Sequence, residues 1–201
     1  MLLFQQRIDT TKWFDSDQAF NQVYPSHIRT LDTRHWTLLK IARKAAGFLS
    51  TGYNARILDV GSGVGKFCLS AGFFYPQSIY YGIEQRRSLI QVAETAKETL
   101  RSGNVTFIHG NFTQLDFRNF DHFYFYNSFY ENLAGTDKID ESIEYSAELY
   151  HYYSRYLFKQ LERMPAGTRL VTYHSLEEEI PADYLVAHSE FDSLLKCWIK
   201  Q

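Results

Sequence analysis

The stretch ILDVGSGVGKF, residues 57–67, places three glycines within five positions directly after an apolar run. Glycine costs about 0.5–1 kcal/mol relative to alanine inside regular structure, so this cluster needs a compensating reason. A turn that joins a buried strand to a helix supplies one, because its backbone then lies against whatever binds at the end of the strand. The stretch therefore predicts a strand, a ligand-facing turn and a helix, in that order.

The sequence on both sides of this turn alternates between strand and helix patterns. We expect strands at residues 56–60, 78–84, 105–109, 122–127 and 168–174, and helices at residues 65–74, 86–101 and 140–163. Such alternation is typical of a parallel sheet with helices on both faces. Two further strands, at residues 183–189 and 194–200, are joined by only a few residues and must run antiparallel to each other.

The residues ahead of the first strand are expected to form a helical cap. A short helix is expected after Ser16 or Asp17, either of which can cap it, and it stops at Pro25. A longer helix is expected at about Arg34–Leu49, where apolar residues repeat at helical spacing.

The predicted fold is α/β: a doubly wound, mostly parallel seven-stranded sheet with an antiparallel terminal hairpin and an N-terminal helical cap. We expect the cap to take residues 1–52 and the sheet domain residues 53–201, within a single globular unit. Only the loop SLEEEIP, residues 175–181, separates the fifth strand from the sixth, so one crossover helix is expected to be missing.

Composition and charge narrow the function classes. The 201 residues are 45% hydrophobic and 17% aromatic, which indicates a packed core and argues against disorder. Lys and Arg number 21 against 23 Asp and Glu, so the chain has no general basic field that would attract nucleic acid or an anionic membrane. There is thus no strong nucleic-acid signal.

Cysteine usage and hydropathy favour a cytoplasmic protein with no metal site. Cys68 and Cys197 lie far apart without CxxC spacing and are interpreted as core thiols in a reducing compartment. No stretch approaches about 18 uninterrupted apolar residues, and the N-terminus lacks the flanks of a signal peptide, so we expect no membrane span. The seven histidines show no HxxxH or HExxH spacing, so no metal is expected.

The glycines do not follow the dinucleotide-binding fingerprint. That fingerprint needs G-x-G-x-x-G, whereas the spacing here is G-x-G-x-G and the sixth position is Lys66. Asp59 stands two places before the first glycine, and Glu84 ends the second strand. A carboxylate there can accept hydrogen bonds from both hydroxyls of a ribose, and charge-assisted bonds of this kind contribute about 1.5–3 kcal/mol each.

This combination resembles motifs one and two of the class I S-adenosylmethionine-dependent methyltransferases, which have a Rossmann-like fold. The resemblance implies a methyltransferase whose cofactor is S-adenosyl-L-methionine. In that family the acid before the glycines lies near the ammonium of the methionine moiety, the glycine loop lies against the cofactor, and the second acid holds the ribose. Carried over by position, the cofactor-binding residues are Asp59, Gly61, Ser62, Gly63, Gly65, Glu84 and Gln85.

The segment after the third strand adds a further match. IHGNFTQL, residues 108–115, resembles the family segment in which a polar residue contacts the adenine amine and the next residue packs on the ring. Those positions are Asn111 and Phe112. Many relatives have Asp at the first position, but an amide oxygen can also accept from the adenine amine.

The segment after the fourth strand, FYFYNSFYEN at residues 123–132, carries the candidate acceptor site. It lacks the Asn-Pro-Pro-aromatic pattern of many methyltransferases that modify amino nitrogen. With the glycine loop, it looks most like the disruptor-of-telomeric-silencing histone-lysine methyltransferases, over roughly residues 56–175. This resemblance implies that Asn127 contacts the cofactor and orients the substrate amine, and that Phe129 and Tyr130 are walls of the site.

The expected methyl acceptor is an amine, carried by a protein lysine or by a small molecule. Transfer is an in-line displacement, so the protein mainly holds the nucleophile about 3–3.5 Å from the methyl group. A lysine amine with a pKa near 10.4 must also arrive neutral, which costs about 4.6 kcal/mol at pH 7 and which an aromatic channel helps to offset. Lys66 replaces a Gln typical of the lysine methyltransferases, and their nucleosome-binding basic tract is absent.

Other interpretations stay open at the level of sequence. The same cofactor could serve a small-molecule or RNA-base acceptor, or the chain could be a non-catalytic S-adenosylmethionine-binding module. His174, just after the fifth strand, could act as a general base, although a histidine there is more often a hydrogen-bonded rim residue. A nucleotide-dependent oxidoreductase is disfavoured by Lys66 in the fingerprint.

Overall fold

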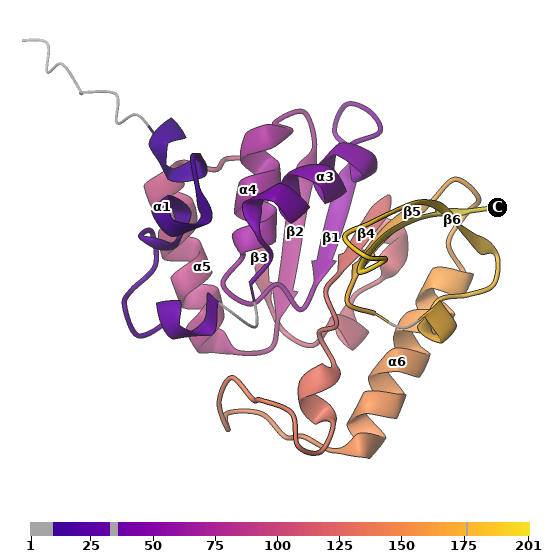
Figure 1. Ribbon diagram of the computed structural model, residues 1–201. Helices are drawn as coiled ribbons and strands as arrows, with labels where there is room; N and C mark the ends of the chain where they lie inside the picture. The colour runs from indigo at the N-terminus through magenta and orange to yellow at the C-terminus, as the bar shows by residue number, and fades with distance from the viewer. Residues whose placement is uncertain (1–9, 33–35, 176) are drawn as a thin grey trace, which may run out of the picture.

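The computed structural model describes residues 10–32, 36–175 and 177–201, and it confirms the predicted α/β sheet. Seven strands form one sheet in the order β3-β2-β1-β4-β5-β7-β6 (Figure 1). The first five strands are parallel, and β7 pairs antiparallel with both β5 and β6. The strand bounds are β1 Arg56–Val60, β2 Ile79–Glu84, β3 Val105–His109, β4 His122–Phe125, β5 Arg169–Tyr173, β6 Tyr184–Glu190 and β7 Leu195–Lys200.

Helices cover both faces of the sheet, as the predicted winding requires. On one face, a single apolar core joins the sheet to α3 (Leu39–Leu49), α4 (Lys66–Phe74) and α5 (Arg87–Leu100). The second core lies under α6 (Ala147–Glu162) and two 3₁₀ turns, η3 (Phe112–Gln114) and η4 (Phe117–Asn119). The winding reverses between β1 and β4, so the carboxyl ends of these strands form the switch point at which such sheets bind ligands.

The helix expected at residues 34–49 begins later than predicted. Residues 34 and 35 lie outside the described residues, and α3 begins at Leu39. The Asp17 carboxylate accepts a hydrogen bond from the Leu39 backbone N–H at 3.0 Å. A side chain 22 residues earlier in the chain therefore satisfies the helix start, which no local pattern could indicate.

The helix expected at residues 140–163 also begins later, at Ala147. The Ser146 hydroxyl accepts a backbone hydrogen bond at 3.1 Å and caps the helix there. The Asp140 carboxylate forms a local turn instead, because it accepts from both the backbone N–H and the hydroxyl of Ser142. The segment between β4 and α6 is thus longer than predicted, and it extends with α6 beyond the lower edge of the sheet in Figure 1.

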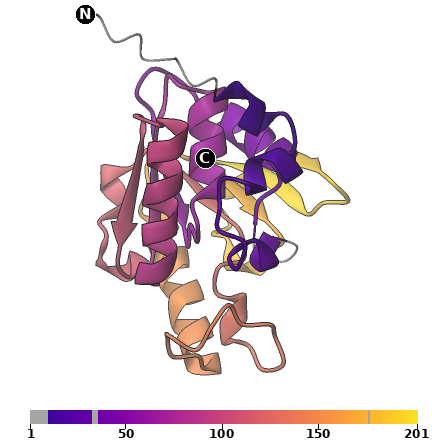
Figure 2. The same ribbon diagram turned by 90° about the vertical axis from the view of Figure 1, so that its left-hand side faces the viewer.

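The N-terminal cap packs on the same face as α3 and α4. The Ser16 hydroxyl caps the first short helix, as predicted. Phe14 stacks on Phe73 of α4 with ring centroids 3.7 Å apart, and Figure 2 shows these N-terminal segments (indigo) from the side. The described cap elements are η1 (Thr11–Phe14), α1 (Asp17–Asn21) and η2 (Arg29–Leu31).

The strand β6 forms one edge of the sheet. Its Leu185 and Val186 side chains are exposed, and a register shift between Val186 and His188 marks a β-bulge against β7. Between β5 and β6 the described residues contain only the 3₁₀ turn η6 (Glu177–Glu179), in agreement with the missing crossover helix.

Two further sequence expectations concern cysteines and membrane spans. Cys68 in α4 and Cys197 in β7 are both buried, and neither forms a disulfide. Within the described ranges, no helix has the length and apolar character needed to cross a membrane.

Candidate active site

The glycine turn leaves β1 and enters α4, and its three glycines serve different purposes. All three have positive φ, at 78° for Gly61, 53° for Gly63 and 77° for Gly65. A Cβ atom on Gly61 would lie 2.4 Å from the Ser128 Cβ, and one on Gly65 would lie 2.2 Å from the Phe107 ring. A Cβ on Gly63 would meet nothing within 4 Å. The missing side chains of Gly61 and Gly65 thus make room for Ser128 and Phe107, whereas Gly63 has open space beside it.

A cavity of about 670 Å³ lies at the switch point, next to this open side. Its volume is within the range of about 300–1,000 Å³ typical of small-molecule sites. It joins the ends of β1, β2, β4 and β5 to the N-terminal cap. The predicted site residues that line it are Asp59, Gly61, Ser62, Gly63, Glu84, Asn127 and Tyr130.

Asp59 is a buried residue whose carboxyl group lines the cavity. Its side chain is 3% exposed, and burial raises its pKa to about 8. The Cys68 thiol lies 3.6 Å from the Asp59 Oδ2 and donates a hydrogen bond that opposes this rise. A cationic ligand group beside Asp59 would favour the ionised carboxylate, so the site fits the ammonium of an amino acid moiety.

Glu84 lies at the carboxyl end of β2, as predicted, and two backbone donors hold it. Its Oε2 accepts from Gly63 N–H at 3.1 Å, and its Oε1 accepts from Arg86 N–H at 2.9 Å. Burial raises the Glu84 pKa, while the Arg86 and Gly63 contacts act in the opposite direction. Each oxygen keeps a further lone pair, so the carboxylate can still accept from the two hydroxyls of a ribose.

Arg86 is a site residue that the sequence did not indicate. Its buried guanidinium contacts Glu131 at 2.7 Å, Asp140 at 3.1 Å and the Tyr145 hydroxyl at 2.6 Å, and lies 3.5 Å from Glu84. Glu131, Asp140 and Tyr145 belong to the segment between β4 and α6, which includes η5 (Tyr130–Asn132), whereas Glu84 ends β2. Arg86 therefore fastens that segment over the cavity. In the sequence, Arg86 is marked only by its place two residues after Glu84, and that place does not indicate that its side chain is buried.

The predicted adenine-binding residues lie beside the main cavity and not within it. Gln85 and Phe112 line a smaller neighbouring cavity of about 30 Å³, which shares Glu84 with the larger one. Asn111 lines neither cavity, and its amide N–H groups donate to Gln85 Oε1 at 3.0 Å and to the Tyr153 hydroxyl at 2.9 Å. The Asn111 carbonyl oxygen accepts from Thr113.

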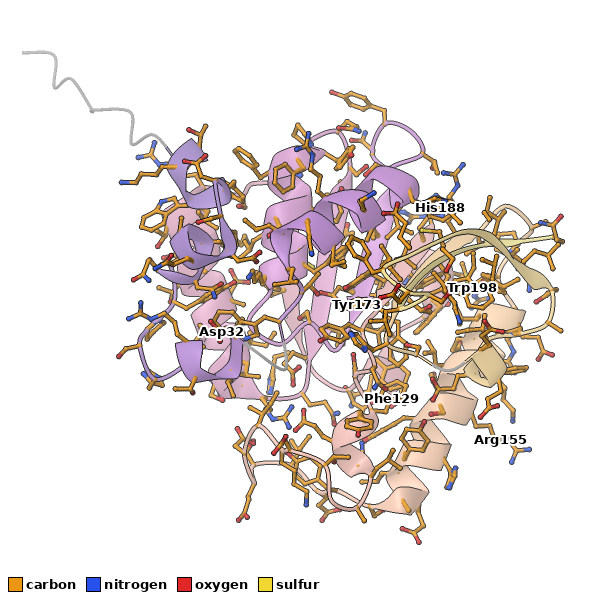
Figure 3. The ribbon with its side chains drawn as sticks, in the orientation of Figure 1. Asp32, Phe129, Arg155, Tyr173, His188 and Trp198 are labelled. Carbon is orange, nitrogen blue, oxygen red and sulfur yellow. The ribbon has the colours of Figure 1, made fainter. Side chains whose placement is uncertain are left out.

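The three predicted acceptor residues divide between cavity and core. Asn127 and Tyr130 line the main cavity, and Tyr130 is 49% exposed. Phe129 lines neither cavity; it is buried against Phe112, at 5.0 Å between ring centroids, and against Tyr153 of α6. Figure 3 shows Phe129 next to α6. Phe129 is therefore a core residue and not a wall of the cavity, because its ring packs in the second apolar core.

Aromatic walls come from other positions of the same segment and from the cap. Tyr124 and Tyr126 line the cavity from the end of β4, and Trp36 and Thr37 line it from the cap. The hydroxyls of Thr37 and Tyr124 are 2.9 Å apart and join the two sides. Of the two predicted walls, Tyr130 lines the cavity and Phe129 does not, and Tyr124 and Tyr126 of the same aromatic segment line it as well.

Lys66, which departs from both sequence patterns, anchors the cap. Its side chain is 3% exposed, and its ammonium donates to the Asp17 carboxylate at 2.6 Å and to the Asn21 amide oxygen at 2.9 Å. Burial lowers the Lys66 pKa, and the Asp17 contact opposes this. Tyr24 adds a second link, because its hydroxyl donates to the Val64 carbonyl at 3.1 Å. Val64 and Lys66, which lie on either side of Gly65, therefore hold the N-terminal cap against the glycine turn.

The described residues contain no group of three or more His, Cys, Asp or Glu side chains that could hold a metal ion. The lining includes buried carboxyl groups, the open backbone at Gly63, aromatic rings, and two cations, Lys66 and Arg86, that are paired with carboxylates. This set suits a ligand that combines a ribose, a positive charge and a planar ring.

Comparison with known proteins agrees with this fit. A family model described as a methyltransferase domain matches residues 52–190, which is more than half of the chain. No curated protein matches the chain significantly.

Solved structures share the fold at low sequence identity. TrmN from Thermus thermophilus is 17% identical, with a TM-score of 0.57 over 84% of this chain and 49% of its own. The putative methyltransferase yhhF from Escherichia coli is 15% identical, with a TM-score of 0.57 over 81% of this chain and 85% of its own. An RNA methyltransferase from Salinibacter ruber, in complex with S-adenosyl-L-homocysteine, is 17% identical, with a TM-score of 0.57 over 82% and 93%. The chain spans about half the length of TrmN.

Proposed function

Because this chain belongs to the methyltransferase domain family and is thus an S-adenosylmethionine-dependent methyltransferase, we propose that it methylates the nitrogen of an amine. The observation that carries the proposal is the single cavity that joins Glu84 and Gly63 to Asn127. Within it, the residues for the cofactor and a candidate residue for the acceptor lie around one continuous space.

The cofactor would lie across the ends of β1 and β2. Glu84 would accept from the ribose hydroxyls, Gly63 would let the backbone approach, and Asp59 would meet the ammonium of the methionine moiety. The adenine would extend from the main cavity toward Gln85 and Phe112, on the side where the two cavities share Glu84. When bound, the cofactor supplies an electrophilic methyl group.

The acceptor would enter near Asn127 and Tyr130. The Asn127 carbonyl oxygen can accept from an amine N–H and so direct the lone pair of the nitrogen. A protein lysine, as in the disruptor-of-telomeric-silencing enzymes, is the finer proposal, and a small amine is the alternative. RNA methyltransferases occur among the structural relatives, so an RNA base is a competing acceptor in the test.

Cofactor binding is tested first, by calorimetry with S-adenosyl-L-homocysteine. Glu84→Gln keeps the size of the side chain but loses the charge, so affinity should fall by about 10- to 150-fold, the equivalent of one charge-assisted hydrogen bond. Glu98→Gln, an exposed change on α5, is the matched control and should bind like the wild type. Equal affinity of all three proteins would contradict the assignment of the ribose site.

Methyl transfer is tested next, with a tritiated methyl donor and separate protein, small-molecule and RNA fractions of a cell extract. Label in protein or in small amines supports the proposal, and Asn127→Ala should then reduce the rate by more than it reduces cofactor affinity. Label confined to RNA, or an Asn127→Ala rate equal to the wild type, would overturn the proposed acceptor chemistry.

A further inference from the structure

Two residues with left-handed backbone follow neighbouring strands and line the cavity. Asn127 follows β4 with φ at 41°, and His174 follows β5 with φ at 56°. The last printed pair of the parallel β4–β5 ladder is Phe125 with Thr172, and Asn127 and His174 each follow two residues later in their own segment. Both residues line the cavity. A left-handed backbone is uncommon outside glycine and occurs often at functional sites, and here it occurs just after two neighbouring strands, β4 and β5.

The His174 imidazole is held by ring contacts and is open to a ligand. It lies parallel to the Tyr126 ring at 5.7 Å between centroids and edge-on to the Tyr173 ring at 4.3 Å. Figure 3 labels Tyr173 at the end of β5. Among the described residues, none forms a hydrogen bond or ion pair with the imidazole, whose residue is exposed at the mouth. Partial burial lowers the His174 pKa, so the ring is neutral at pH 7 and can accept a proton.

The charges around this mouth favour a cationic acceptor. Both cations of the lining are engaged by carboxylates, Lys66 by Asp17 and Arg86 by Glu131 and Asp140. A phosphate would therefore find no uncompensated cation in the described lining. The strand beside His174, β7, carries Lys196, which is paired with Glu177. The acidic and basic side chains that line the cavity are Asp59, Lys66, Glu84, Arg86, Glu131 and Asp137.

We propose that the space between Asn127 and His174 is the acceptor subsite, that it takes an ammonium-bearing acceptor, and that the His174 imidazole removes the proton that frees the amine. The ammonium gives one proton to a ring nitrogen. The amine lone pair then forms the new N–C bond, and the electron pair of the broken S–C bond stays on sulfur. The product is a methylated ammonium, and the imidazolium returns its proton to solvent at the open mouth. This inference rests on the methyl-transfer function proposed above.

The sharpest test removes the His174 imidazole while it keeps the left-handed backbone conformation at that position. Asn tolerates positive φ, so His174→Asn keeps the local backbone conformation while it removes the proton acceptor together with its ring contacts to Tyr126 and Tyr173. Its rate at pH 7 should fall by about 10²–10⁴-fold, and the loss should shrink as the pH approaches the pKa of the free amine. His174→Gly should show the same loss and regain activity with added imidazole. His188→Asn, an exposed histidine on β6, is the control.

A second readout does not depend on turnover. In protein loaded with S-adenosyl-L-homocysteine, the imidazole resonance of His174, assigned by its loss in His174→Asn, should shift with butylammonium chloride and stay in place with sodium phosphate. A shift with phosphate alone, or with neither salt, would overturn the ammonium subsite.

The outcomes of the rate measurements separate this inference from the proposed function. Labelled peptides indicate a lysine source of the amine, and labelled small amines indicate a metabolite source; either supports the inference if His174→Asn is slow. A labelled fraction with His174→Asn as fast as wild type overturns this inference alone. Bound S-adenosyl-L-homocysteine without any labelled amine fraction overturns both.

Discussion

The buried carboxyl of Asp59 makes cofactor affinity depend on pH. Its pKa of about 8 means that the group is mostly protonated at pH 7 and cannot pair fully with the ammonium of the ligand. We expect the affinity for S-adenosyl-L-homocysteine to rise between pH 6 and pH 8, by at most about tenfold per pH unit, and to level off above the pKa. Calorimetry at a series of pH values measures this slope.

Asp59→Asn is the control for that slope, since an amide does not titrate. If the affinity still changes with pH in Asp59→Asn, another titrating group causes the pH dependence.

The folding stability changes with pH in the opposite direction to the ligand affinity. Because the pKa of Asp59 in the folded state lies above its ordinary value of 3.8, the free energy of unfolding falls as the pH rises from about 4 to about 8.

Residue identities in the site could be predicted only where a motif dictates the contact. Glu84 and Gly63 were found because a strand-end acid and a ligand-facing glycine follow from position along the chain. Phe129 and Arg86 depend on which ring fills the second core and which cation is buried, and both follow from tertiary packing. A single sequence does not contain that information in local form.

At the scale of elements, the link between α1 and α4 predicts the effect of loosening the cap. Asp17→Asn would leave the buried Lys66 ammonium without its carboxylate, so we expect the free energy of unfolding to fall by about 1–3 kcal/mol. The cap should also become more accessible, which raises the rate of trypsin cleavage after Arg29 in η2. Denaturant unfolding and timed proteolysis measure the two effects.

Asp15→Asn, two residues earlier and exposed, is the matched control for the cap. It removes the same charge from the same segment without touching Lys66. If both variants unfold and are cleaved alike, the anchor contributes nothing and net charge alone explains the change.

Element existence was predictable, and element starts were not. Every predicted strand occurs, because buried strands and the turns between them have strong local patterns. The starts of α3 and α6 were wrong by several residues, since Asp17 satisfies the first from a distance and Ser146 caps the second after an irregular segment. Helix propensity alone extended both predictions too far toward the N-terminus.

At the scale of the whole molecule, ligand binding should raise the melting temperature. A ligand at 100 times its dissociation constant stabilises the folded state by about 2.7 kcal/mol, which corresponds to about 5–10 °C for a chain of this size. S-adenosyl-L-homocysteine should give this shift, and nicotinamide adenine dinucleotide should give none. An equal shift with the dinucleotide would contradict the assignment of the cavity to the methyl donor.

The architecture of the whole chain was the most predictable level, because the strand and helix pattern and the glycine turn both indicate a doubly wound sheet. The proposed acceptor end of the cavity was the least predictable. It is assembled from the cap, β4 and β5, whose residues come together only in the folded chain, such as Thr37 with Tyr124.

The irregular pairing at Val186 and His188 bears on how copies of the chain behave at high concentration. A regular outer strand with exposed aliphatic groups is a template onto which another polypeptide can add, and long unbroken templates seed aggregation. The extra residue interrupts the spacing of backbone donors and acceptors, so an incoming strand could match only a few of them. The β-bulge thus disfavours aggregation at the edge strand β6, where the Leu185 and Val186 side chains are exposed.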